Sequence, residues 1–268
     1  MTAISTDPIA ARSPTPGPIT FVRYAFPPNH HGYCGPPDSQ SFFEYGANSL
    51  IDGGLRSLAM QFAGAWPYLE LIAGATGIAD PLDRRVVEAY WVGNPLLDRV
   101  GATALGGSME DRFRRRVGSQ FTNLAESVVA GGVPHHSYHV FCIYPWVGLL
   151  TADRHGAHAL NVLDRCRVRW GQVRRIHGDH LEVASRLLSF DGRQLRLGEP
   201  EPETVERALD SVGLIPDLAV GDWVSMHWEW VCDRLSTGQV AALRHYTRHH
   251  LDVANDRLDH PGATLALG

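Results

Sequence analysis

The sequence predicts an α+β protein, with a mostly helical N-terminal domain followed by a small β barrel of the OB type and a C-terminal helix. Apolar residues recur at three- and four-residue intervals between Phe42 and Phe62, which is typical of helices. From Arg165 onward, short alternating runs are separated by Gly-Asp and Asp-Gly pairs, which favour hairpins. A meander of short strands that ends in a helix is typical of a small closed barrel.

The length and composition agree with a globular protein of two domains. The chain has 268 residues, of which 44% are hydrophobic and 20% charged, so disorder cannot dominate it. Its formal net charge of −5 provides no global basic field, and we expect neither nucleic acid nor membrane as a partner. The expected divisions are a tail over residues 1–18, a mostly helical domain over 19–158, a barrel domain with its terminal helix over 159–260, and a tail over 261–268.

The cysteines and the start of the chain indicate a cytoplasmic protein. The four cysteines, Cys34, Cys142, Cys166 and Cys232, lie far apart and form no CxxC pair, which argues against a zinc ribbon or a disulfide framework. No apolar run approaches the roughly 20 residues that span a bilayer. The first residues also lack the apolar segment of a signal peptide. We therefore expect free thiols in a reducing compartment.

The N-terminal half is expected to be helical after a short extended segment. Residues 19–26 read as a strand ended by two prolines, and residues 29–38 as a turn-rich loop. Two glycines interrupt the next apolar pattern, so two helices are expected to join near Asp52. Further helices are expected to begin at Asp80 and at Ser108, because acidic residues follow in each first turn.

The second half is expected to be mainly β structure. The segment from Tyr138 to Leu150 is aromatic and β-branched without a helical stripe, which favours a strand or a buried extended segment. Ser236 and Gln239 form a capping box before the final helix. The other expected elements are a linker over 152–158, hairpin turns at 177–179 and 191–192, a short helix over 204–212 and a strand over 221–231.

Two segments of the C-terminal third carry a resemblance to a known family. CRVRWGQV opens with Cys166, and a later VGDWVSMH segment ends at His227. In this order they resemble the HypC/HupF family of [NiFe]-hydrogenase assembly chaperones, which has a CxxxPGxV opening and a later VGDxVxVHxGFA strand. Here Cys166 lies inside the chain, Trp170 stands in place of the family's proline, and residues 229–231 replace the GFA segment. The matching positions are Cys166, Gly171, Val173, Val220, Gly221, Asp222, Val224 and His227.

This resemblance implies a non-enzymatic accessory protein of [NiFe]-hydrogenase maturation with a HypC-like barrel. In the family the equivalent cysteine helps to hold an Fe(CN)2CO unit, so the resemblance assigns transient iron cargo to Cys166, with His227 as a second metal-site residue. The implied partners are the hydrogenase large-subunit precursor or a HypD-like scaffold. The N-terminal half, on segments such as FEYG and YPWVGLL, looks like an uncharacterised actinobacterial-type family that occurs beside hydrogenase clusters.

The residues around Cys166 also suggest that its thiol is reactive. Arg165 and Arg167 flank the cysteine and Arg169 follows, and nearby positive charge favours the thiolate, the form that binds a soft metal. The alternative is an ordinary buried cysteine.

A second possible site, in the helical half, would suit a metal-dependent enzyme. His30, His31 and Cys34 lie on one Gly- and Pro-rich loop, and loops of this composition often carry function. His135 and His139 have the spacing of an HExxH motif, although His136 stands where the motif has its glutamate. The alternative for both groups is structural: a rigid turn, and histidines that hydrogen-bond within an extended segment.

Aromatic and histidine residues near the C-terminus are less specific. Strand alternation would place Trp228 and Trp230 on one face, either as a partner-binding patch or as part of the core. His245, His249 and His250 are expected on a solvated face of the last helix.

Overall fold

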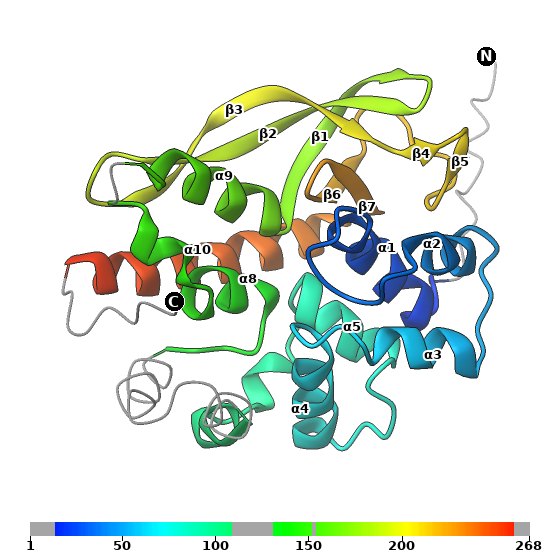
Figure 1. Ribbon diagram of the computed structural model, residues 1–268, viewed down its shortest axis with the longest axis horizontal. Helices are drawn as coiled ribbons and strands as arrows, with labels where there is room; N and C mark the ends of the chain where they lie inside the picture. Colours follow the sequence, from blue (N-terminus) through cyan, green and yellow to red (C-terminus); the bar gives the residue numbers. More distant parts are fainter. Residues whose placement is uncertain (1–13, 109–130, 152–153, 260–268) are drawn as a thin grey trace, which may run out of the picture.

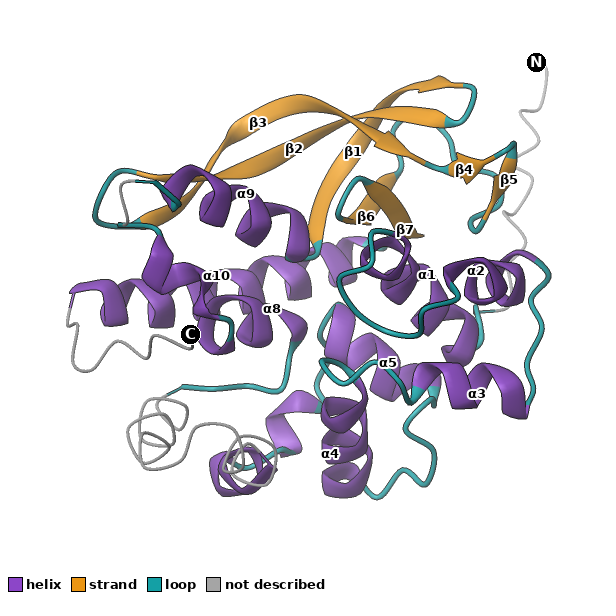
Figure 2. Ribbon diagram, in the orientation of Figure 1, coloured by secondary structure: helices purple, strands orange, loops and turns teal. Residues whose placement is uncertain are grey.

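The computed structural model describes residues 14–108, 131–151 and 154–259. A strongly curved sheet lies along one side of the molecule, with the N-terminal helices beneath one end and the long C-terminal helix crossing below it (Figure 1). Figure 2 shows that the strands are confined to this side. The N-terminal helices are α1 (Gly17–His30), α2 (Ser39–Ala47), α3 (Gly53–Ala59), α4 (Trp66–Thr76), α5 (Arg84–Trp91) and the 3-10 helix η1 (Leu97–Arg99).

Aspartate residues are the N-caps of three of these helices. The carboxylates of Asp38, Asp52 and Asp83 accept hydrogen bonds from backbone N–H groups in the first turns of α2, α3 and α5. The junction of two helices near Asp52 is therefore confirmed. The helix expected from Asp80 begins instead at Asp83, because Asp80 accepts from Leu82 N, at 2.9 Å, in the preceding turn. Ser108 does not begin a helix, since residues 102–108 are already helical, and the rest of that expected helix lies outside the described residues.

The prediction of a strand over residues 19–26 is wrong, because this segment forms most of α1. Twelve of the 14 residues of α1 are buried, so no polar face marks the helical period in the sequence. A short apolar run of this kind cannot be assigned to helix or strand from periodicity alone. The two prolines that were expected to end a strand lie in the last turn of the helix.

The segment from Tyr138 to Leu150 is also helical and not extended, for the same reason. It forms α8 (His136–Tyr138), the π-helical turn η3 (His139–Ile143) and the 3-10 helix η4 (Pro145–Leu149). All residues of α8 and η3 are buried. Helix α9 (Gly156–Cys166) follows, so the expected division between residues 158 and 159 falls inside a helix.

Five strands close into a barrel in the order β1-β2-β3-β7-β6. All neighbouring strands are antiparallel except β3 and β7, which meet in parallel at Glu206 and Trp230. The hairpin turns expected at 177–179 and 191–192 are confirmed. The strands are β1 (Arg169–His177), β2 (His180–Phe190), β3 (Leu195–Glu206), β6 (Trp223–His227) and β7 (Trp230–Arg234).

Two expectations for the barrel are wrong. The helix expected over 204–212 is absent, because β3 continues to Glu206 and a small hairpin follows, formed by β4 (Ala208–Leu209) and β5 (Val212–Gly213). The strand expected over 221–231 is divided into β6 and β7 by a tight turn at Trp228, whose φ of 53° lies in the left-handed region.

The helical half and the barrel share one hydrophobic core. A cluster of buried residues runs from Ile19 in α1 to Ala254 in the final helix α10 (Thr237–Asp259). A smaller cluster, including Val183 and Met226, fills the barrel interior. The predicted capping box of α10 is confirmed, since Ser236 N donates to Gln239 Oε1 and Gln239 N donates to Ser236 Oγ. Within the described part of the chain, no helix has the length and hydropathy to cross a membrane.

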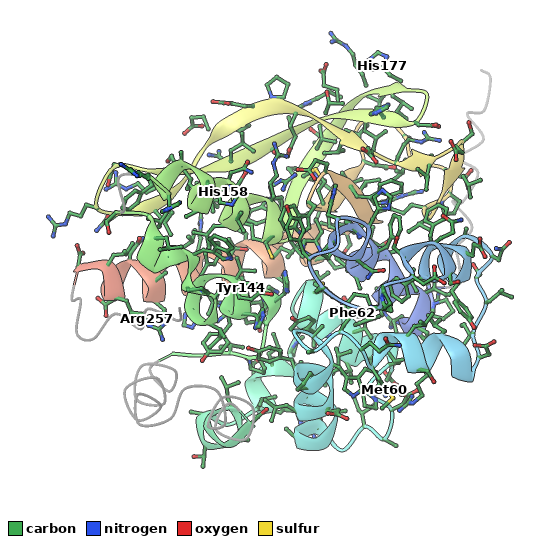
Figure 3. All side chains as sticks on the ribbon, viewed as in Figure 1. Met60, Phe62, Tyr144, His158, His177 and Arg257 are labelled. Atoms are coloured by element: carbon green, nitrogen blue, oxygen red, sulfur yellow. The ribbon has the colours of Figure 1, made fainter. Side chains whose placement is uncertain are left out.

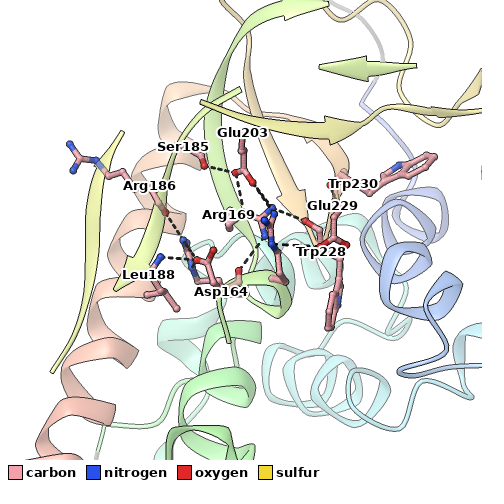
Figure 4. Close-up of polar contacts among 12 residues, drawn as sticks. Asp164, Arg169, Ser185, Arg186, Leu188, Glu203, Trp228, Glu229 and Trp230 are labelled. Atoms are coloured by element: carbon pink, nitrogen blue, oxygen red, sulfur yellow. Dashed lines mark hydrogen bonds and ion pairs between the residues drawn. The ribbon is translucent and has the colours of Figure 1, made fainter. Parts of the chain in front are cut away.

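A buried ion-pair network joins α9 to the barrel (Figure 4). The side chain of Arg169 has no exposed surface, and its guanidinium donates to Glu203 at 3.0 Å, to the Trp228 carbonyl oxygen at 2.7 Å and to the Asp164 carbonyl oxygen at 3.2 Å. Arg167 is paired with the Asp164 carboxylate at 2.8 Å. These contacts fix the end of α9 against β3 and the β6–β7 turn.

We predict that Glu203→Gln destabilises the protein by about 3 kcal/mol, because it leaves the buried Arg169 charge without its carboxylate. Glu182→Gln is the matched control on the neighbouring strand, since Glu182 pairs with a largely exposed Arg175. Loss of that exposed pair should cost less than about 1 kcal/mol. Urea denaturation of both variants measures the difference, and equal losses would contradict the role assigned to Glu203.

Candidate metal centre

Three potential metal ligands from distant parts of the chain meet at the junction of helices and barrel. His136 lies in α8, Cys166 is the last residue of α9, and His227 is the last residue of β6. One ligand atom from each lies within 4.8 Å of the other two. The centroids of the two imidazole rings are 4.9 Å apart. One thiol and two imidazoles at this spacing can coordinate a single borderline or soft metal ion.

The three side chains line a cavity of about 250 Å³ between the two halves of the chain. Most of its wall is aromatic, including Tyr90, Trp91 and Trp228. Figure 3 labels three further lining residues, Phe62 from the N-terminal half and Tyr144 and His158 from the segment before the barrel. The cavity is partly open to solvent, but its largely apolar lining strengthens electrostatic interactions with a bound cation.

His227 has the orientation and tautomer of a metal ligand. Its Nδ1 lies 2.6 Å from the Tyr24 carbonyl oxygen, so this nitrogen carries the proton and donates it. Its Nε2 is buried and makes no hydrogen bond of ordinary geometry with the described residues, although the Cys166 carbonyl group lies near enough to raise the pKa of His227. A buried nitrogen lone pair without a partner is costly, and a metal ion in the cavity would satisfy it.

His136 differs from His227, because both of its ring nitrogens have a hydrogen-bond partner. Its Nε2 lies 2.8 Å from the Cys166 carbonyl oxygen and donates to it, which leaves the lone pair on Nδ1. That Nδ1 is 3.2 Å from the Tyr90 hydroxyl, which also lies 3.1 Å from the Gly64 carbonyl oxygen. When the hydroxyl donates to Gly64, the Nδ1 lone pair is available to a metal.

Burial keeps both imidazoles neutral. It lowers the pKa of His136 to about 4, and it lowers the pKa of His227 well below its ordinary value, with a further contribution from His136. Neutral imidazole is the form that binds metals.

The prediction that the neighbouring arginines favour the thiolate form of Cys166 is wrong. Burial raises the pKa of its thiol, and the proximity of Cys34 raises it further. The three arginines do not offset this effect, because their guanidinium groups pair with carboxylates of Asp164, Glu203 and Glu229. The cysteine also ends α9 and does not open a strand, so the negative end of the helix dipole lies near it. A bound metal cation would reverse this balance and displace the thiol proton.

Comparison with protein families gives a match over almost the whole chain. The model described as "Family of unknown function (DUF6390)" matches residues 13–261. The chain belongs to the DUF6390 family. No curated protein and no solved structure matches it. The matched range includes both the helical half and the barrel, and the three positions of the candidate centre lie within it.

The alternative ligand set proposed from the sequence is only partly brought together. Cys34 and His139 line the same cavity as the three-residue centre of the DUF6390 protein. His135 instead accepts a hydrogen bond from Ser137 N and packs on Tyr246. His30 is the last residue of α1 and packs against Phe26, whereas His31 in the following loop forms an ion pair with Glu229 at 3.1 Å. These five residues therefore do not form one site.

His136 belongs to the candidate centre but was not among the ligands predicted from the sequence. The HHSYH segment was noted for its first and last histidines, because their spacing matches a zinc motif. The segment turns out to be helical, and the middle histidine faces Cys166 and His227. A helical assignment of the segment would have separated His135 from His136 by about 100° around the helix axis.

The two tryptophans considered either as a partner-binding patch or as core are buried. Trp228 is 6% exposed and lies in the β6–β7 turn, and Trp230 is 3% exposed and begins β7, so burial favours the core alternative. Trp228 stacks on Tyr33 at 4.2 Å, at the mouth of the cavity. His250 is also buried, against the expectation of a solvated face, and bonds to Ser137 Oγ at 2.7 Å.

We predict that the DUF6390 protein releases about one proton for each zinc(II) ion bound between pH 6 and 8. The imidazoles are already deprotonated in this range, whereas the Cys166 thiol must lose its proton to coordinate. The affinity should therefore rise about tenfold for each pH unit. Calorimetric titration in buffers of different ionisation enthalpy measures the number of protons released for each zinc ion bound. Release of two or more protons at pH 6 would show that the histidines are protonated in the free protein.

Proposed function

We propose that the protein is a non-enzymatic accessory protein of [NiFe]-hydrogenase maturation that holds iron as cargo at His136, Cys166 and His227. One observation carries the proposal. The two residues assigned to a metal site by resemblance to the HypC/HupF family, Cys166 and His227, are 61 positions apart in the sequence, yet their ligand atoms lie within 4.8 Å. This proximity of two residues from distant segments, with a third ligand beside them, supports a shared metal site.

The barrel topology gives further support. Its order, with a parallel contact between the third and last barrel strands, is compatible with an OB-type barrel, the architecture expected for a HypC-like domain. The matching motif positions also contact one another. Val173 N donates to the Asp222 carbonyl oxygen, and Gly221 N donates to the Val173 carbonyl oxygen, both at 2.9 Å. Gly221, with a φ of 93°, provides the left-handed turn that this contact requires.

The donor set suits iron as a transient cargo. A thiolate with two imidazoles binds divalent iron, and three protein ligands leave positions for small ligands that the metal carries. The cavity of about 250 Å³ is larger than a bare ion needs. Cys166 is about 9% exposed, so cargo would enter and leave through the cavity mouth beside Tyr33 and Trp228. The proposed recipient is the hydrogenase large-subunit precursor or a HypD-like scaffold.

A metal-dependent enzyme is the second candidate. Cys34 and His139 line the same cavity, so a larger set of polar groups could act on a small substrate beside a resident metal. Tight stoichiometric zinc would favour the enzyme if it survives Cys166→Ala and is lost in the double variant Cys34→Ala and His139→Ala.

We predict that the protein binds one iron(II) ion under anaerobic conditions and that Cys166→Ala abolishes binding. Cobalt(II) is the optical probe, because a cobalt–thiolate bond gives intense charge-transfer absorption. Cys142→Ala is the matched control, since Cys142 is also buried but lies outside the cavity. Absorption that persists in Cys166→Ala would contradict the site.

The hydrogenase assignment needs a separate test in the native host. We predict that the tagged protein, isolated anaerobically, co-purifies with a hydrogenase large-subunit precursor or a HypD-like scaffold, and that Cys166→Ser lowers hydrogenase activity. Mass spectrometry identifies the partners. Recovery of no hydrogenase component, together with unchanged activity in Cys166→Ser, would contradict the assignment and leave the metal site standing.

A further inference from the structure

A groove of about 490 Å³ lies between helix α10 and the first three barrel strands, away from the metal cavity. Its floor includes Trp170 and Leu251, both buried. Its polar lining is strongly cationic although the chain as a whole is acidic, with a formal net charge of −5. Four arginines and one aspartate line it: Arg186, Arg196, Arg244, Arg248 and Asp252.

Two of these arginines have no partner in the described part of the chain. Arg244 and Arg248 are exposed, and no ion pair or hydrogen bond joins their guanidinium groups to another described residue. They lie four positions apart on α10, where like charges destabilise a helix by a few tenths of a kcal/mol. In contrast, Arg193 in the turn between β2 and β3 is paired with Asp259, the last residue of α10, at 2.8 Å. The guanidinium groups of Arg244 and Arg248 therefore remain available to a ligand.

The walls of the groove are held in place before any ligand binds. Asn255 of α10 accepts from Leu195 N at 2.8 Å and donates to the Leu195 carbonyl oxygen at 3.0 Å, which ties the helix to β3. Arg186 donates to the Gly198 carbonyl oxygen at 2.7 Å and pairs with Glu199 at 3.5 Å. Arg196 donates to Gln194 Oε1 at 3.1 Å and pairs with Asp191 at 3.5 Å, so the free positive charge of the groove lies on α10. A preformed site loses less conformational entropy on binding.

We propose that this groove docks an acidic segment of a partner protein. Guanidinium groups bind carboxylates through paired hydrogen bonds, and two unpaired ones a helical turn apart can engage successive acidic side chains. A short acidic segment fits a local cationic groove, whereas the net negative charge of the chain disfavours an extended polyanion such as nucleic acid. The inference does not rest on the metal site, whose residues lie outside the groove.

The test uses a fluorescent octaglutamate peptide and the full chain in an anisotropy titration at low ionic strength. We expect saturable binding that the double variant Arg244→Glu and Arg248→Glu weakens at least ~tenfold. The control is Arg174→Glu with Arg207→Glu, which makes the same change in net charge at barrel residues outside the groove. The control should alter affinity less than ~threefold, the effect of net charge alone.

Three results would overturn the proposal. The first is equal weakening in both double variants, which would indicate only a general charge effect. The second is unchanged binding in the groove variant. The third is displacement of the peptide by oligodeoxythymidylate of the same charge at lower concentration than by unlabelled octaglutamate, which would identify a nucleic-acid surface. Circular dichroism of each variant confirms that the fold is retained.

Discussion

The buried guanidinium of Arg169 is the constraint on which the arrangement of the site depends. A charge without solvent contact is very costly unless it is paired and hydrogen-bonded, so its partners must be in place together. These partners are the Glu203 carboxylate, the Asp164 carbonyl oxygen and the Trp228 carbonyl oxygen. They belong to β3, α9 and the β6–β7 turn, which therefore cannot shift independently. Because Cys166 ends α9 and His227 ends β6, the same contacts hold the thiol beside the imidazole.

The features that could be predicted from the sequence are those fixed by local chemistry. The hairpin turns at 177–179 and 191–192, the junction at Asp52 and the capping box at Ser236 all follow from residues a few positions apart. The features that could not be predicted are segments buried on every side. Residues 19–26 and the segment after Tyr138 are helical, but tertiary burial has removed the polar face by which a helix is recognised.

For the candidate site, too, residues within sequence motifs could be predicted, whereas contacts made by the tertiary fold could not. Cys166 and His227 were identified from motifs that resemble a family, while His136 became a ligand candidate only when the fold placed it beside them. The charge of the thiol could not be inferred from neighbours in the sequence. Arg165, Arg167 and Arg169 surround Cys166 along the chain, yet their charges are paired with the carboxylates of Asp164 and Glu203, and desolvation dominates.

The central claim is that one metal ion is coordinated jointly by a thiolate and two imidazoles at the junction of helices and barrel. X-ray absorption at the zinc edge of the zinc-loaded protein tests it most directly. The account predicts one sulfur at about 2.3 Å and two imidazole nitrogens at about 2.0–2.1 Å. Loss of the sulfur shell in Cys166→Ala, with the nitrogen shells reduced in His136→Ala, would complete the assignment. A spectrum of the unmodified chain with only oxygen and nitrogen neighbours would contradict it.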